Sequence, residues 1–251
     1  MTGASEVALC ILGGGASKGL VASLRAAFEA AHGVAIDGRF SAVGAVRDRF
    51  VAGEPCDVLI LTATLIDQLT RDGMLLAGSA VPIGAVQTAV AVPSGHDLPA
   101  IGSGEALRDS LLAASGLYVP DTRRSTAGGH VRDVLRALGI EAAMAPRLRE
   151  FPNGETAMRA LAEERHTEGD TGGIGCTQAT EIRHTPGLTL VGPLPPPHGL
   201  VTVYTAACSA TTRQPELARA LVAWLTGPDA QAACEQAGFE RPAAAAADAR
   251  Q

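Results

Sequence analysis

The sequence is poor in aromatic side chains and in charge, and both deficits narrow the functions to consider. Aromatic residues make up 3% of the 251 residues and charged residues 18%, with a formal net charge of −6. Proteins that bind single-stranded nucleic acids stack bases on aromatic rings, and proteins that bind duplexes neutralise phosphates with basic patches. We therefore expect no nucleic-acid partner. Any bound anion must be held by local features rather than by a broad positive field.

Long apolar runs and paired cysteines are also lacking. No run approaches the ~20 apolar residues of a membrane-spanning helix, so we expect no membrane insertion. The five cysteines are scattered, without a Cys-x-x-Cys pair or zinc-like His/Cys spacing, so we expect no metal and no cofactor. No basic leader segment precedes the apolar stretch Val7–Leu12. The chain as it stands is therefore predicted to be cytoplasmic, or periplasmic if a leader peptide has been removed.

Lysine is almost absent. Lys18 is the only lysine among 20 basic residues, and the others are arginines. The arginine bias fits a GC-rich genome, in which a single lysine survives by chance. Alternatively, position 18 needs a compact ammonium group that a guanidinium does not replace. The sequence leaves both explanations open.

What the sequence does have is a regular alternation of strand and helix patterns. In the first part of the chain, strands are predicted at 7–12, 34–40 and 57–61, and helices at 20–32, 44–52 and 65–72. Such alternation predicts parallel strands joined by crossover helices. From about residue 86, strands are predicted at 87–92, 116–119, 172–175, 188–191 and 200–206, and helices at 104–114, 130–138, 155–164 and 215–225. The alanine run at 243–247 is expected to be a frayed tail or a short terminal helix.

Several segments along this pattern resemble a known family. They are Leu9–Phe28, Arg39–Ala45, Gly53–Ile60, Tyr118–Gly129 and the closing stretch Pro215–Gln231. All are similar to the molybdate-binding proteins of ABC importers, within the type-two periplasmic-binding-protein group. The similarity covers most of the chain. Aconitate isomerase is an enzymatic relative on the same scaffold.

The resemblance implies an α/β fold of two lobes, each a central sheet flanked by helices, with the ligand cleft between the lobes. Residues 1–84 and 200–251 would form the first lobe, and residues 85–199 the second. Ligands of the family lie where helix N-termini point into the cleft, at the carboxyl ends of the strands. Unpaired N–H groups and the helix dipole favour negative charge there, so we expect a small anionic ligand.

The oxyanion-binding side chains of that family are only partly matched. The resemblance places the first ligand-binding serine at Ala16 or Ser17, the second at Val43, and a late tyrosine near Cys176. Val43 cannot donate a hydrogen bond through its side chain. Each hydrogen bond lost to a charged ligand costs on the order of 1.5–3 kcal/mol. Molybdate is therefore not the expected ligand.

Other residues offer replacement contacts near the same loops. The candidate ligand-binding residues are Gly14, Gly15, Ala16, Ser17, Lys18, Ser41, Val43, Arg123, Arg124, Ser125, Thr126, Asn153 and Thr177. The neighbouring arginines can hold planar carboxylates through paired hydrogen bonds. The ordinary alternative is a loop of two solvated arginines in which Ser125 or Thr126 caps a helix.

Two functions fit this combination. The first is a solute-binding protein for a small organic anion, a di- or tricarboxylate, which would serve an ABC permease if the chain is exported. The second is an isomerase of the aconitate type, in which Lys18, His130 or Cys176 would move an allylic proton while arginines hold the carboxylates. A ligand-sensing module ranks third, because no output element is evident. Fold analogy alone does not decide between them.

Overall fold

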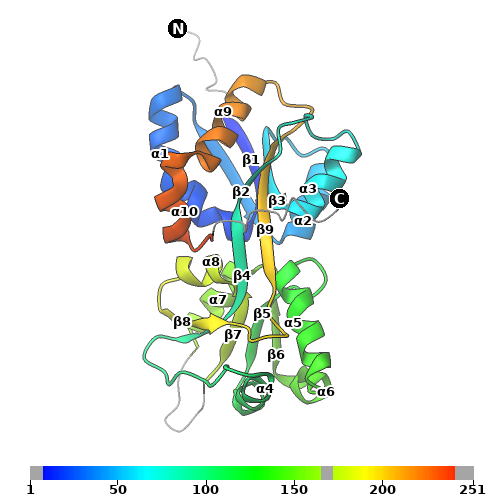
Figure 1. Ribbon diagram of the computed structural model, residues 1–251, viewed down its shortest axis with the longest axis vertical. Helices are drawn as coiled ribbons and strands as arrows, with labels where there is room; N and C mark the ends of the chain where they lie inside the picture. Colours follow the sequence, from blue (N-terminus) through cyan, green and yellow to red (C-terminus); the bar gives the residue numbers. More distant parts are fainter. Residues whose placement is uncertain (1–7, 165–171, 241–251) are drawn as a thin grey trace, which may run out of the picture.

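The computed structural model describes residues 8–164 and 172–240, which form two lobes stacked one above the other (Figure 1). The upper lobe in Figure 1 holds both the beginning and the end of the described chain. The predicted alanine tail at 243–247 lies outside the described residues. Among the residues described, no helix is both long enough and apolar enough to span a membrane.

The first lobe is a five-stranded sheet with helices on both sides. Its strands are β1 (Leu9–Gly14), β2 (Ile36–Ser41), β3 (Val58–Thr62), β9 (Val201–Cys208) and the first half of β4 (Val81–Pro93), in the order β2-β1-β3-β9-β4. Strand β1 pairs in parallel with β2 and β3, as predicted, whereas β9 runs antiparallel to β3 and β4. The helices are η1 (Gly15–Ser17), α1 (Lys18–His32), α2 (Val43–Val51), α3 (Ala63–Arg71), α9 (Pro215–Thr226), η3 (Pro228–Ala230) and α10 (Gln231–Ala237).

The second lobe is built around the other half of β4. Its remaining strands are β5 (Leu117–Pro120), β6 (Leu148–Phe151), β7 (Ile174–Gln178) and β8 (Leu188–Pro193). Strand β5 pairs in parallel with β6 and β7, and β4 pairs antiparallel with β7 and β8. The helices are α4 (Gly104–Ala113), α5 (Thr126–Ala137), α6 (Glu141–Met144), η2 (Ala145–Arg147), α7 (Gly154–Ala162) and α8 (Ala179–His184).

Strands β4 and β9 cross between the lobes. Residues 81–87 of β4 pair with β9, and residues 88–91 pair with β7, so β4 belongs to both sheets. At the crossing, the Thr88 N–H donates to the Leu200 carbonyl at 2.9 Å. The lobe boundary predicted at 84/85 falls inside β4, where Val86 packs in the core of the first lobe and Ala89 in a cluster of the second.

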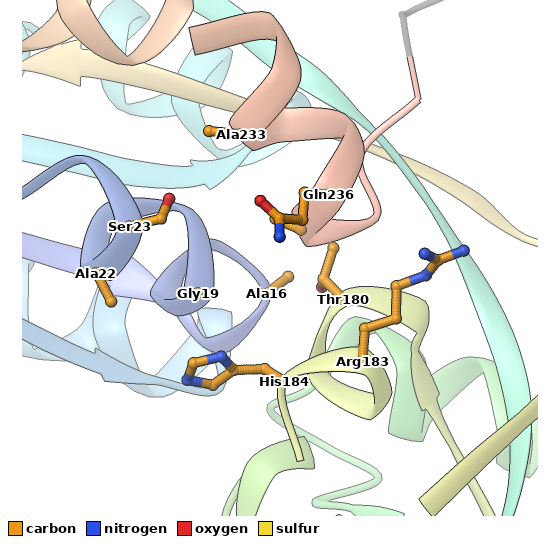
Figure 2. Close-up of a pocket in the computed structure, with 10 residues that line it drawn as sticks. Ala16, Gly19, Ala22, Ser23, Thr180, Arg183, His184, Ala233 and Gln236 are labelled. Carbon is orange, nitrogen blue, oxygen red and sulfur yellow. The ribbon is translucent and has the colours of Figure 1, made fainter. Parts of the chain in front are cut away.

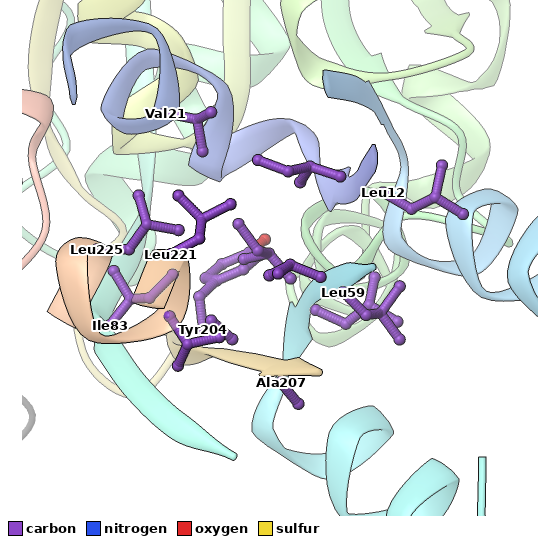
Figure 3. Packing of buried hydrophobic residues seen from close by; sticks show 14 of the residues in the cluster. Leu12, Val21, Leu59, Ile83, Tyr204, Ala207, Leu221 and Leu225 are labelled. Atoms are coloured by element: carbon purple, nitrogen blue, oxygen red, sulfur yellow. The ribbon is translucent and has the colours of Figure 1, made fainter. Parts of the chain in front are cut away.

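Each lobe is stabilised by its own apolar core. In the first lobe, Figure 3 shows the Tyr204 ring among the aliphatic side chains of Leu59, Ile83 and Leu221. In the second, one cluster surrounds Leu117 and another contains Met158, Leu161 and Ile182, on the other face of the sheet. Burying one large aliphatic side chain contributes roughly 1.5–3 kcal/mol relative to leaving it exposed. Each lobe therefore has an apolar core of its own.

Four differences from the predicted elements have local physical reasons. Strand β4 is 13 residues long, whereas the predicted strand covers only 87–92. The prediction missed its beginning because Val81 and Pro82 are exposed and show no apolar pattern. Helix α5 begins at Thr126 rather than 130, since Ser125 caps it ahead of two glycines that mask the helical pattern. Strand β6 was not predicted, because it is an edge strand with charged residues, and the six-residue helix α8 was too short to show periodicity.

Candidate ligand-binding site

The two lobes meet where strands end and helices begin. In the first lobe, β1, β2 and β3 lead into η1, α2 and α3; in the second, β5, β6 and β7 lead into α5, α7 and α8. The lobes are in direct contact, since the Gly44 N–H at the start of α2 donates to the Arg124 carbonyl before α5 at 2.8 Å. Helix N-termini from both lobes therefore converge on one cleft, the arrangement that favours an anion.

An open groove of about 570 Å³ lies in this cleft, and we call it the inter-lobe groove. Its walls come from the starts of α2, α3 and α5 and from β9. The lining residues are Val43, Gly44, Thr62, Ala63, Thr64, Leu65, Arg123, Arg124, Ser125, Thr126, Leu200, Val201, Thr202 and Val203. Five of the predicted ligand-binding residues, Val43 and the run 123–126, thus share one groove.

The side chains of Arg123 and Arg124 are exposed at the groove. Within the described part of the chain, neither guanidinium forms an ion pair. The loop is fixed instead through the backbone, because both N–H groups donate to Asp121 Oδ1, at 2.8 and 3.0 Å. Ser125 Oγ accepts from the Gly128 N–H at 3.4 Å, which confirms the capping role considered for Ser125. The arginines remain available to bind an anion.

A second set of polar residues lies deeper in the cleft: Thr177, Gln178, Glu181 and Tyr204, which we call the inner cluster. Each is buried. Thr177 Oγ1 donates to Glu181 Oε2 at 2.5 Å, and Gln178 Nε2 donates to Thr202 Oγ1 at 3.3 Å. Because Thr202 also lines the groove, the inner cluster adjoins the inter-lobe groove.

The Glu181 carboxylate is the main feature of the inner cluster. It lies against Gly15 of the first lobe and Gly154 of the second so closely that a Cβ at either glycine would overlap it. Burial raises the pKa of Glu181 to about 7; hydrogen bonds from Thr177 and from the backbone oppose this rise, and the nearby Glu155 charge adds to it. Sequence reasoning missed Glu181, because Thr177 lies in a strand and Glu181 in a short helix, so their spacing follows no helical pattern.

The predicted residues of the first loop do not offer free donors. Ser17 is fully buried, and its Oγ donates to the Gly14 carbonyl at 2.8 Å. Lys18 Nζ crosses the cleft to both oxygens of Glu155, each at 2.7 Å. The sole lysine therefore forms an inter-lobe ion pair, and the ligand contacts predicted for Ser17 and Lys18 are not available in this conformation.

Asn153, Thr177 and Ser41 also have defined places. Asn153 Oδ1 caps α7, accepting from the backbone N–H and the hydroxyl of Thr156 at 2.9 and 2.8 Å. The Thr177 hydroxyl is committed to Glu181. Ser41 ends β2 and is partly exposed. Among the described residues, neither the Ser41 hydroxyl nor the Asn153 side-chain N–H groups donate a hydrogen bond, so these two predicted donors are free.

Two of the predicted catalytic residues do not line the inter-lobe groove. Cys176 packs in the core of the second lobe, where burial raises the pKa of its thiol to about 12. A thiol that stays protonated near neutral pH is a poor base, so its burial argues against the predicted catalytic role of Cys176. His130 lies on α5, and its Nε2 is 2.7 Å from the His198 carbonyl.

A further pocket of about 410 Å³ lies between α1, α8 and α10. Figure 2 shows Thr180, Arg183 and His184 on α8, facing Gly19 and Ser23 of α1 and Gln236 of α10. Ala16, a predicted ligand-binding residue, lines this pocket rather than the inter-lobe groove. Helix α8 thus packs against both lobes, which holds Glu181 at their junction.

The fold agrees with the comparisons to known proteins. The family model described as bacterial extracellular solute-binding protein matches residues 9–240, so this chain belongs to that family. The chain is 27% identical to an aconitate isomerase of a Pseudomonas species over 244 residues, covering 92% of this chain and 87% of that protein.

Solved structures show the same fold. The periplasmic molybdate-binding protein of Azotobacter vinelandii superimposes with a TM-score of 0.74 at 19% identity, covering 94% of this chain and 100% of the other. The sulfate-binding protein of Mycobacterium tuberculosis H37Rv gives 0.70 at 17% identity, covering 92% and 86%. The two-lobed periplasmic-binding-protein fold and the resemblance to molybdate-binding proteins are confirmed.

Proposed function

We propose that this solute-binding protein holds a small organic anion with two or three carboxylates in the inter-lobe groove. The observation that carries the proposal is the pair Arg123 and Arg124, exposed at a groove of about 570 Å³ and without ion pairs among the described residues. Guanidinium groups match the planar carboxylate with two parallel hydrogen bonds. The N-termini of α2, α3 and α5 add partial positive charge at the same groove.

The side chains disfavour molybdate or sulfate held by neutral hydroxyl donors. Ser17 Oγ is buried and committed to the Gly14 carbonyl, and Val43 has no hydrogen-bonding side chain. A compact tetrahedral dianion would therefore lose side-chain partners on the first lobe, whereas a longer carboxylate reaches the arginines of the second lobe. The proposal thus names the class of anion, a di- or tricarboxylate, rather than one compound.

Family membership also bears on partner and location. A solute-binding protein delivers its small-molecule ligand to a permease, so we propose an ABC permease as the macromolecular partner. The family is described as extracellular, which favours a periplasmic location for this protein over a cytoplasmic one.

A second candidate function is an isomerase acting on a tricarboxylate. It is favoured by the identity to aconitate isomerase, which extends over 92% of this chain. Allylic proton transfer needs a base near the substrate carbon. Lys18 is tied to Glu155 and His130 to a backbone carbonyl, which leaves Glu181 as the titrating group of the inner cluster best suited to that role.

Thermal unfolding in the presence of candidate anions tests the proposal. Tricarballylate, citrate, trans-aconitate and succinate are compared with molybdate and sulfate. A ligand at one hundred times its dissociation constant stabilises by about 2.7 kcal/mol, a readily measured shift in Tm. We expect shifts with carboxylates only; a shift with molybdate alone contradicts the proposal. Proton NMR of cis- and trans-aconitate with the same protein separates binding from isomerisation, since only an isomerase interconverts them.

A further inference from the structure

Glu181 places a carboxylate where the two lobes touch. Its oxygens lie against the backbone of Gly15 in the first lobe and of Gly154 at the start of α7 in the second. Thr177 donates to Oε2 at 2.5 Å, and the side chain is buried. An anion-binding cleft of this fold therefore contains a carboxylate of the protein itself, set beside the N-terminus of a helix.

In residues 8–164 and 172–240, Glu181 forms no ion pair. Lys18 is held by Glu155, whose own charge disfavours ionisation of Glu181. Apart from Lys18 and Glu155, the titratable or charged groups on α8 and on the elements packed around the inner cluster are Arg183 and His184 of α8 itself, Arg159 of α7, Arg25, Glu29 and His32 of α1, Cys176 of β7, Tyr204 and Cys208 of β9, and Cys234 and Glu235 of α10.

A ligand anion adds negative charge to a junction that already holds Glu181. When the lobes close, water leaves the cleft, and two neighbouring negative charges repel more strongly than in water. A neutral carboxyl removes that repulsion and gains an O–H that donates a hydrogen bond. Closure around an anion is thus favoured when Glu181 carries a proton.

We propose that the cleft takes up one proton from solvent together with its anion, and that Glu181 holds this proton. This inference rests on the proposed binding of an organic anion, and it adds that the protonation of Glu181 governs the affinity for that anion. Since burial already brings the pKa of Glu181 to about 7, the proton exchanges near neutral pH. The sign follows from linkage: the protonated form binds, so affinity rises as pH falls and declines as pH rises through that pKa.

Isothermal titration with tricarballylate, a saturated tricarboxylate that cannot isomerise, tests this at pH 6 and pH 8. For a group of pKa about 7 that must be protonated, the dissociation constant rises about tenfold between these pH values. The Glu181→Gln variant supplies the baseline for ionisation of tricarballylate itself, so the tenfold change is the excess of wild type over the variant. Heats at pH 8 in phosphate and in Tris, which differ in ionisation enthalpy, give the protons taken up, expected to be about one more in wild type.

Glu155→Gln is the matched control, because it removes the other carboxylate at this junction. It should keep the excess proton uptake that Glu181→Gln loses, and loss in Glu155→Gln instead would overturn the assignment. If Glu181→Gln does not fold, Glu181→Met replaces it. Binding by wild type without excess uptake contradicts this inference and leaves the proposed function standing. If wild type binds no carboxylate at either pH, the proposed function fails, and this inference fails with it.

Discussion

The inter-lobe groove and the inner cluster adjoin at Thr202, yet their charged groups are in opposite situations. In the groove, Arg123 and Arg124 are exposed and hold no ion pair among the described residues. In the inner cluster, Glu181 is buried, hydrogen-bonded to Thr177 and in contact with both lobes. Water stabilises the charge of an exposed guanidinium even when no ligand is bound, whereas burial disfavours the ionised form of a carboxylate.

This contrast assigns the affinity for the anion and the pH dependence of that affinity to different residues. The arginines can supply attraction for an anion, and the buried acid can set the pH at which closure is favourable. Glu181 has a pKa raised in the folded state, so the folded protein holds more protons than the unfolded chain between the ordinary carboxyl value and about 7. The free energy of unfolding therefore declines as pH rises through this window.

The largest expected effect is on binding, when the groove loses its cations. In the variant Arg123→Ala/Arg124→Ala, hydrogen bonds to charged carboxylates worth roughly 1.5–3 kcal/mol each are removed. The dissociation constant of tricarballylate should rise by about 100-fold or more, measured by isothermal titration. The matched control is Arg132→Ala/Arg136→Ala on helix α5, where both arginines lie beside Asp133. Equal losses in both variants would refute a specific role for the groove arginines.

The smallest expected effect comes from the inter-lobe pair of Lys18 and Glu155. Burial raises the pKa of Glu155, but Lys18 and Arg159 outweigh this and leave the pKa lowered. Partly exposed pairs contribute about 0–1 kcal/mol, so Lys18→Met should lower the free energy of unfolding by no more than that. The difference should be present above pH 4.5, the ordinary value, and vanish as pH falls through the lowered folded pKa.

Tricarballylate binding adds a second readout for the same variant. Because Lys18 faces Glu155 rather than the groove, we expect Lys18→Met to change the dissociation constant by less than about threefold. A loss as large as that of the arginine pair would show that Lys18 contacts the ligand. Lys18 would then belong to the ligand-binding site together with the groove arginines.

Much of the fold could be predicted from alternation of strand and helix patterns, which are local. The parallel pairing of β1 with β2 and β3 followed from it. The placement of Arg123 and Arg124 before a helix followed instead from the family resemblance, because the pattern alone put that helix at 130–138. The antiparallel return of β9 next to β3 depends on a crossing strand, and local pattern does not encode it.

The inner cluster could not be predicted in the same way. Glu181 follows a short strand in a six-residue helix, and its burial depends on Gly15, 166 positions earlier by residue number, and on Gly154. The partner of Lys18 is 137 residues away. Ser17 and Cys176 were expected in the cleft because the family resemblance placed ligand-binding positions at or near them, but both side chains are buried.

A crystal structure of the complex with tricarballylate at pH 6 tests the central claim most directly. We expect carboxylate density in the inter-lobe groove, within hydrogen-bonding distance of the Arg123 or Arg124 guanidinium and at the N-terminus of α5. Density placed instead in the pocket between α1, α8 and α10, with the inter-lobe groove empty, would contradict it.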